Sequence, residues 1–173
     1  IDERLVAGIV NAVLSRMGDD ESPSTDADGG SWGIFESMDD AVEAAAAAQK
    51  KYLNCTMHDR AAYVKAIRDV VLKQENLEYI SRQSVEETEM GNYEHKLIKN
   101  RLAATKTPGI EDLTTDAMSG DDGLTLVEYS PFGVIGAITP TTNPTETIIC
   151  NSIGMLAAGN SVVFSPHPRA KNV

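Results

Sequence analysis

The sequence has 173 residues, of which 42% are apolar, so it is long enough for one domain or for part of a larger one. Its net charge of −11, from 15 basic and 26 acidic residues, argues against nucleic acid as a partner. The two cysteines do not have CxxC spacing and therefore indicate neither a disulfide framework nor a zinc site, and no bound metal is expected. No stretch approaches the ~20 apolar residues of a membrane span and no signal peptide opens the chain, which predicts a cytoplasmic protein without a membrane partner.

Residues 1–17 predict an amphipathic helix, because their apolar side chains recur at helical spacing and would form one stripe. Residues 18–30 contain five acidic residues, no basic residue and no large apolar side chain, as expected of a flexible, solvated linker. A helix on such a tether suits docking to a partner. Folding back on the same chain, or pairing within an oligomer, is the open alternative. The main domain is expected to span residues 31–173.

Four helices are predicted to follow. Ser37 and Thr56 each stand three residues before an aspartate, which is the spacing of a capping box, and each would begin a helix. A third helix is expected around residues 77–85 and a fourth from Tyr93 to about Ala104. Nothing in the sequence pairs with their cysteine or histidines to make a catalytic set, so this layer is interpreted as structural.

The segment between Asp112 and Ser130 predicts two strands. Residues 120–123 have the composition of a turn, and residues 124–129 alternate as a strand does. The strands near 114–130 would leave an exposed edge, which needs a partner.

Residues 129–168 predict a β-α-β unit of an α/β nucleotide-binding sheet. A buried strand is expected at 134–138, a helix that begins at Pro144 and runs to about Ala158, and a second strand at 161–165. Ligands of such sheets bind at the carboxyl ends of the strands, so the turns that follow the two strands are the candidate site. Neither turn contains a GxGxxG or GxxxxGK[ST] phosphate loop.

The runs PFGVIGAITPTTNPTETI and NSIGMLAAGNSVVFSPHP, together with KNRLAATKTPGIEDL upstream, closely resemble the aldehyde dehydrogenase superfamily. Within it they are most similar to the CoA-acylating propionaldehyde and acetaldehyde dehydrogenases of bacterial microcompartments, and the similarity extends from about Phe35 onward. Lys96 and Lys99 match a basic pair of that family, but a solvated helix face is the simpler interpretation. The family commonly has glycine where this chain has Glu89, so a turn without positive φ is expected there.

The resemblance implies the N-terminal part of a Rossmann-like NAD-binding domain, with a helical layer and with strands of an oligomerisation arm. It also implies a homo-oligomer. Similar N-terminal tails in the resembled enzymes are encapsulation peptides, so residues 1–17 are expected to bind a shell protein and to place the enzyme inside a microcompartment.

The chemistry implied by the resemblance is oxidation of a short-chain aldehyde, propionaldehyde or acetaldehyde, to acyl-CoA. A cysteine thiolate attacks the aldehyde, hydride passes to NAD, and the thioester then transfers its acyl group to coenzyme A. Asn143 matches the residue whose amide donates to the oxyanion of the tetrahedral intermediate. The alternative for Asn143 is an ordinary turn or N-cap residue before a proline.

The resemblance places NAD at the ends of the two strands. The expected cofactor-binding residues are Thr139, Pro140, Thr141, Ser165, His167 and Pro168. Many hydrolytic relatives have a lysine where this chain has Ser165, and that lysine bonds to the adenosine ribose, so this contact is in doubt here. His167 is equally explained as a loop histidine between prolines.

The nucleophilic cysteine of the family is expected beyond Val173. Separately, a helix is expected to begin at residues 169–173. Cys150 is interpreted as a buried packing residue, because no histidine or lysine stands near it in the sequence. The 173-residue chain alone is therefore expected to be inactive. A non-catalytic nucleotide- or shell-binding module, or a CoA-independent aldehyde dehydrogenase, are the alternatives.

Overall fold

The computed structural model describes residues 33–173, so the predicted helix at 1–17, the linker at 18–30 and the first two residues of the main domain lie outside the described residues. The compact unit spans Ser37–Val173. Its helices are α2 (Met38–Tyr52), α3 (Met57–Val71), α4 (Gln74–Thr88), α5 (Tyr93–Lys106) and α6 (Pro144–Ala157), with a 3-10 turn, η2, at Ile110–Asp112. Its strands are β1 (Asp116–Gly120), β2 (Gly123–Val127), β3 (Val134–Thr139) and β4 (Ser161–Pro166). The predicted α/β class is confirmed.

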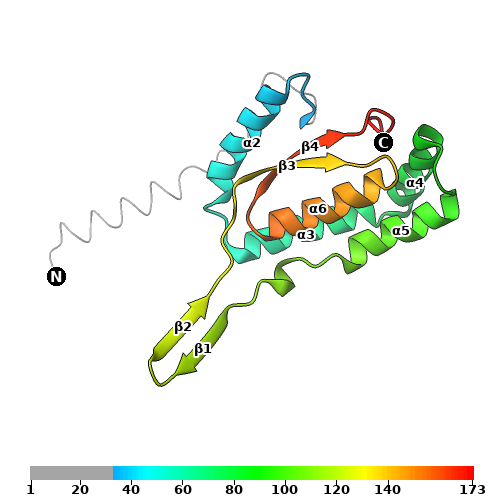
Figure 1. Ribbon diagram of the computed structural model, residues 1–173. Coiled ribbons are helices and arrows are strands. Elements are labelled where there is room, and N and C mark those ends of the chain that lie inside the picture. Colours follow the sequence, from blue (N-terminus) through cyan, green and yellow to red (C-terminus); the bar gives the residue numbers. More distant parts are fainter. Residues whose placement is uncertain (1–32) are drawn as a thin grey trace, which may run out of the picture. The chain divides into compact units, whose positions relative to one another are not determined.

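The centre of the unit is the predicted β-α-β motif. Strands β3 and β4 pair in parallel, with Val134 opposite Ser161 and Thr139 opposite Pro166, and α6 forms the crossover between them. Helix α6 packs against one face of the strand pair, and α2 covers the other face (Figure 1). Pro144 begins α6 as predicted, and Gly159 ends it with a φ of +84°. Residues 169–173 form turns rather than the helix expected there.

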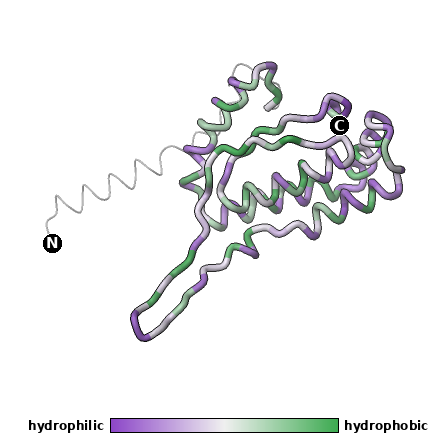
Figure 2. The backbone as a smooth tube through the Cα atoms, in the orientation of Figure 1, coloured by the Kyte–Doolittle hydropathy of each residue, from purple (hydrophilic) through white to green (hydrophobic). Residues whose placement is uncertain are grey.

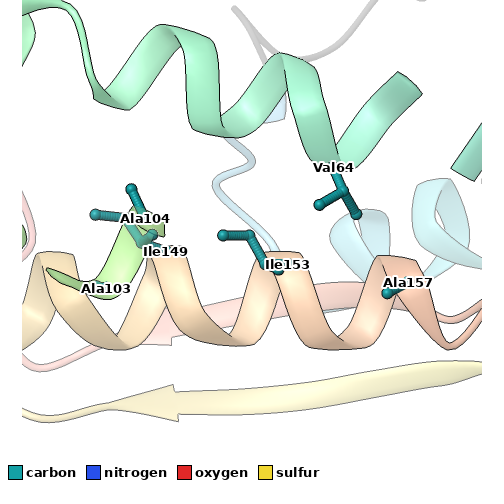
Figure 3. Close-up of a cluster of buried hydrophobic side chains, with 6 residues drawn as sticks. All are labelled: Val64, Ala103, Ala104, Ile149, Ile153 and Ala157. Atoms are coloured by element: carbon teal, nitrogen blue, oxygen red, sulfur yellow. The ribbon is translucent and has the colours of Figure 1, made fainter. Parts of the chain in front are cut away.

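The hydrophobic core lies where α6 meets α3 and α5. Figure 3 shows α6 directing three apolar side chains, spaced at helical intervals, toward one side chain of α3 and two small ones of α5. The six buried residues are Val64, Ala103, Ala104, Ile149, Ile153 and Ala157. Ile153 is completely buried, and burial of such a side chain stabilises the fold by about 1.5–3 kcal/mol. The alanines of α5 allow the helices to approach closely.

Helix α2 is fixed to the turn between α6 and β4 by buried polar contacts. The Gln49 side chain donates to the carbonyl of Gly159 at 2.9 Å and accepts from the backbone N–H of Ser161. The Tyr52 hydroxyl donates to the carbonyl of Leu156 at 2.7 Å, and its burial raises the pKa of Tyr52 to about 12. The folded state therefore favours the neutral hydroxyl of Tyr52. Its contribution to stability is complete below the ordinary tyrosine pKa near 10 and is lost as pH rises towards 12.

The capping box predicted at Thr56 is present. Its hydroxyl accepts from the N–H of Asp59, and the Asp59 carboxylate accepts from the N–H of Thr56 at 2.8 Å. The hydrogen bonds from Thr56 hold the pKa of Asp59 below its usual value, so this contribution to stability is present above the unfolded-state pKa and is lost as pH falls through the folded-state pKa. Ser37 caps α2 differently from the prediction, because it accepts from the N–H of Asp39.

Strands β1 and β2 form the antiparallel hairpin predicted near 114–130, with Asp116 opposite Val127 and Gly120 opposite Gly123. Every residue of both strands is exposed, including the apolar Met118, Leu124 and Leu126. Figure 2 shows a hydrophilic tip between two strands that carry hydrophobic stretches. Both outer edges of this hairpin lack a strand partner within the described residues.

Glu89 ends α4 in the left-handed conformation, with φ 57° and ψ 26°. The expectation that a glutamate would avoid positive φ here was wrong. Its N–H bonds to the carbonyl of Val85, and the Thr88 hydroxyl accepts from the N–H of Met90 at 3.2 Å, so the surrounding turn holds the backbone in place. A left-handed residue that carries a Cβ costs about 1–2 kcal/mol relative to glycine.

Replacing Glu89 by glycine is therefore expected to stabilise the protein by about 0.5–1 kcal/mol, because glycine takes positive φ without a steric penalty. Urea unfolding followed by circular dichroism would measure the change. The matched control is Glu86→Gly, on the exposed face of the same helix, where glycine should destabilise by about 1 kcal/mol. A loss of stability in Glu89→Gly would show that the Glu89 side chain contributes more than its backbone conformation costs.

A buried ion pair joins α5 to the first turn of α6. Lys96 is 2% exposed and Glu146 is 8% exposed, and the ammonium lies 3.5 Å from the Glu146 carboxylate. Lys96 also donates to the carbonyl of Thr142 at 2.7 Å, just before α6 begins. The prediction of a solvated helix face for Lys96 was wrong, because the side chain points into the layer between the helices.

Removing one member of a buried pair leaves the other charge without its partner, so Lys96→Met is expected to destabilise the protein by about 3 kcal/mol. The double variant Lys96→Met/Glu146→Gln should recover part of that loss, because the uncompensated carboxylate is then gone. Thermal unfolding of the two single variants and the double variant measures the coupling. Strictly additive losses would show that the two groups do not stabilise one another.

Candidate active site

The carboxyl ends of β3 and β4 lie side by side. In the parallel register, Ile138 is opposite Ser165 and Thr139 is opposite Pro166. The structure therefore brings the predicted residues Thr139 and Ser165 to the same edge of the sheet. Pro140 and Thr141 continue from β3, and His167 and Pro168 continue from β4.

Two hydroxyls at the end of β3 are buried without a partner. Thr139 is 1% exposed, and within residues 33–173 neither its Oγ1 nor that of Thr141 makes a hydrogen bond. A buried hydroxyl without a partner costs free energy, so unsatisfied groups in a fold call for an explanation. Here both occur at the edge where a ligand of an open α/β sheet would bind, which fits a polar ligand that supplies the missing hydrogen bonds.

The segment after β4 is held in a defined turn. The His167 ring accepts from the N–H of Arg169 through Nδ1 at 3.1 Å, and the His167 carbonyl accepts from the N–H of Ala170 at 2.8 Å. The Glu87 carboxylate then accepts from the N–H groups of Lys171 and Asn172, each at 3.0 Å. His167 is thus ordered by its own turn, and within residues 33–173 its Nε2 makes no hydrogen bond.

Asn143 occupies the N-cap position of α6, but its side chain does not cap the helix. Its carbonyl accepts the first helical bond from Thr147, whereas its side-chain Oδ1 accepts a hydrogen bond from the ammonium of Lys99. Its Nδ2 lies 3.5 Å from Thr142 Oγ1. Of the alternative interpretation, in which Asn143 is an ordinary turn or N-cap residue, the side-chain cap is absent, whereas the position before Pro144 is as that interpretation expects.

An open groove of about 600 Å³ runs along α5 and the beginning of α6. Asn143, Lys99, Glu146 and Cys150 line it. Residues at the end of α5 and at the start of the following loop line it as well. Asn143 is therefore accessible to a small molecule from the groove, as a group that donates to a substrate must be.

Sequence reasoning missed the charged cluster beside Asn143. Lys99 is half exposed, yet it contacts Asn143 and lies 3.6 Å from Glu146, so it is not an ordinary solvated lysine. Glu146, on α6, is the shared neighbour of Lys96 and Lys99. The spacing of Lys96 and Lys99, one helical turn apart, was the available signal that both face one neighbour.

Cys150 differs in part from the prediction. It packs against the core cluster, but it is only half-buried and also lines the groove. The Thr107 hydroxyl donates to its sulfur at 3.0 Å. Within the described residues no basic side chain hydrogen-bonds to the thiol, so Cys150 has no base paired with it there.

Within residues 33–173, no three histidine, cysteine or acidic side chains are grouped so that they could hold a metal ion. None of the helices in that part of the chain is both long enough and apolar enough to cross a membrane.

Among known proteins, the propanal dehydrogenase (CoA-propanoylating) of Citrobacter freundii is 55% identical over 141 residues, which are 82% of this chain and 30% of that protein. The solved structure of Rhodopseudomonas palustris propionaldehyde dehydrogenase, with bound CoA and an acylated cysteine, is 79% identical with a TM-score of 0.79. That match covers 82% of this chain and 32% of the other. The chain thus spans about a third of the length of the relatives it matches.

A third neighbour is the propionaldehyde dehydrogenase from the fucose utilisation microcompartment of Clostridium phytofermentans, which is 58% identical with a TM-score of 0.75. It is matched over 80% of this chain and 31% of its own. The model of the aldehyde dehydrogenase family matches residues 33–173. The match includes both strand ends, the groove and Asn143. The chain therefore belongs to the aldehyde dehydrogenase family.

Proposed function

We propose that the chain is the N-terminal part of an enzyme that oxidises a short-chain aldehyde to its acyl-CoA thioester. The observation that carries the proposal is the 55% identity to a CoA-propanoylating propanal dehydrogenase over 141 residues. The acetylating acetaldehyde dehydrogenase EutE of Salmonella typhimurium is 41% identical over 173 residues. Propionaldehyde is therefore the first substrate to test and acetaldehyde the second.

In this mechanism Asn143 donates to the substrate oxygen. When a thiolate adds to an aldehyde, the carbonyl oxygen gains a full negative charge, and a donor aimed at it lowers the energy of the transition state. The Asn143 amide stays uncharged and is held at the groove by the backbone of α6 and by Lys99. Its role is electrostatic stabilisation, not proton transfer.

The carboxyl edge of β3 and β4 fits a dinucleotide. The hydroxyls of Thr139 and Thr141, which have no hydrogen-bond partner within residues 33–173, would donate to or accept from it, and the neighbouring Pro140 would lie against it. Ser165, His167 and Pro168 would border its other half. When bound, NAD or NADP supplies the hydride acceptor of the reaction. An engineered glycolyl-CoA reductase that is 78% identical holds NADP+, so either cofactor has to be tested.

The nucleophile is proposed to come from a part of the enzyme outside residues 1–173. Cys55 and Cys150 are the cysteines of this chain, and within the described part neither hydrogen-bonds to a basic side chain. The Rhodopseudomonas palustris neighbour carries an acylated cysteine, and only 32% of that chain is matched here. The 173-residue chain alone is therefore expected to be inactive.

Two partners complete the proposal. The exposed β1–β2 hairpin, with its free edges and apolar side chains, would pair with another subunit of a homo-oligomer. Residues 1–17 would bind a microcompartment shell protein and carry the enzyme into the compartment, which is the setting of the Clostridium phytofermentans neighbour.

The full-length gene product should form NADH from propionaldehyde and NAD+ only when CoA is present to take up the acyl group. Absorbance at the NADH band, with CoA present and then omitted, is the measurement. Continued turnover without CoA would indicate a CoA-independent aldehyde dehydrogenase. Absence of turnover with both NAD+ and NADP+, while either cofactor still binds, would favour a non-catalytic binding module.

Deletion of residues 1–17 is expected to abolish co-purification of the full-length enzyme with its shell while leaving aldehyde oxidation unchanged, because the candidate site residues of this chain all lie between Lys96 and Pro168. Sedimentation with purified shells, followed by an activity assay of both fractions, measures the two properties. Shortened enzyme that still sediments with the shells would exclude the docking role of this segment.

A further inference from the structure

Lys99 contacts both Asn143, the proposed oxyanion donor, and Glu146 of the buried ion pair. Its ammonium donates to Asn143 Oδ1 and lies 3.6 Å from Glu146 Oε1, and all three side chains line the groove. Glu146 is shared, because Lys96 lies 3.5 Å from the same oxygen. The contacts therefore run in one chain from Lys96 through Glu146 and Lys99 to Asn143.

The cluster carries an excess of positive charge. Lys96 and Lys99 contribute two ammonium groups and Glu146 one carboxylate, so one positive charge is not balanced within the cluster. Lys96 is buried and also bonds to the carbonyl of Thr142, so it is committed to the backbone before α6. Lys99 is the cation that touches Asn143 and remains partly open to the groove, with 47% of its side chain exposed.

We propose that Lys99 is a positioning residue for the Asn143 amide, an inference that rests on the aldehyde oxidation proposed above. An ammonium can only donate hydrogen bonds, so the amide must present its oxygen to Lys99. A flip of the amide would place two donors against each other. The Nδ2 hydrogens then face away from Lys99. One of them lies near Thr142 Oγ1, at an Nδ2–Oγ1 distance of 3.5 Å, which leaves the other for an oxygen in the groove.

Lys99 also prevents Asn143 from acting as a helix cap. Asparagine at an N-cap normally uses its Oδ1 to accept from an N–H of the first helical turn, which stabilises the helix. In this structure the Asn143 side chain makes no such bond, and Lys99 holds the oxygen that would make it. Without Lys99, the N–H groups of α6 compete for Oδ1 and draw the amide out of the groove.

The same contact makes the amide a better donor. Accepting from a cation polarises the amide, which strengthens the bond that its N–H groups give. This effect is larger in the transition state, where the substrate oxygen carries a negative charge, than in the ground state, so it acts on kcat rather than on the KM for the aldehyde.

The test uses the full-length enzyme and the variant Lys99→Met. We expect kcat to fall about 10- to 100-fold, the loss typical of a misplaced catalytic group, with the aldehyde KM and the melting temperature little changed. Lys99→Arg, which keeps a cationic donor, should recover part of kcat. Lys65→Met is the matched control, because Lys65 is 73% exposed on α3 and bonds to Asp69, and it should behave as wild type.

A double-mutant cycle separates positioning from a general charge effect. Asn143→Ala should lower kcat about 10²- to 10³-fold. If Lys99 acts through Asn143, adding Lys99→Met to Asn143→Ala causes no further loss. A full further loss in the double variant would overturn the proposal.

Crystal structures of the full-length wild type and Lys99→Met give a readout that does not depend on activity. We expect the Asn143 side chain to leave its wild-type rotamer in the variant, and an unchanged rotamer would overturn the proposal. Absence of aldehyde oxidation in the wild type would defeat the proposed function instead. The comparison of rotamers would still decide whether Lys99 positions Asn143.

Discussion

The buried contact between Lys96 and Glu146 is the constraint on which the site depends. Burying two charges costs several kcal/mol of desolvation, which is recovered only when each charge has close partners. Glu146 belongs to the first turn of α6, so satisfying it fixes where that turn meets α5. Thr142 and Asn143 immediately precede the turn, and their positions follow from it. The hydrogen bond from Lys96 to the Thr142 carbonyl also holds this segment in position.

The elements of the fold were predictable because their signals are local. The parallel strands, the Pro144 start and Gly159 stop of α6, and the capping box at Thr56 each depend on residues close together in the sequence. The left-handed Glu89 was not predictable, since its cost of about 1–2 kcal/mol is offset by hydrogen bonds of the surrounding turn. The turns at 169–173 likewise depend on Glu87, which is distant in sequence.

The candidate site was only partly predictable. A family resemblance identified Asn143 and the two strand ends, and the register of the sheet confirms that those ends are neighbours. Lys99, the partner of Asn143 Oδ1, lies 44 residues earlier in the chain, on a helix whose lysines were expected to be solvated. Only packing of α5 against α6 reveals that Lys96 and Lys99 converge on Glu146. The unpaired hydroxyls of Thr139 and Thr141 also appear only once burial is known.

We propose that this chain supplies the oxyanion donor and the cofactor edge, while a cysteine elsewhere in the enzyme carries the acyl group. Incubating the full-length protein with propionaldehyde and NAD+ or NADP+ without CoA, followed by peptide mapping by mass spectrometry, locates the trapped thioester. The account predicts one propionylated cysteine outside residues 1–173, discharged on addition of CoA. A propionyl group on Cys150 or Cys55, or a thioester that CoA does not discharge, would contradict it.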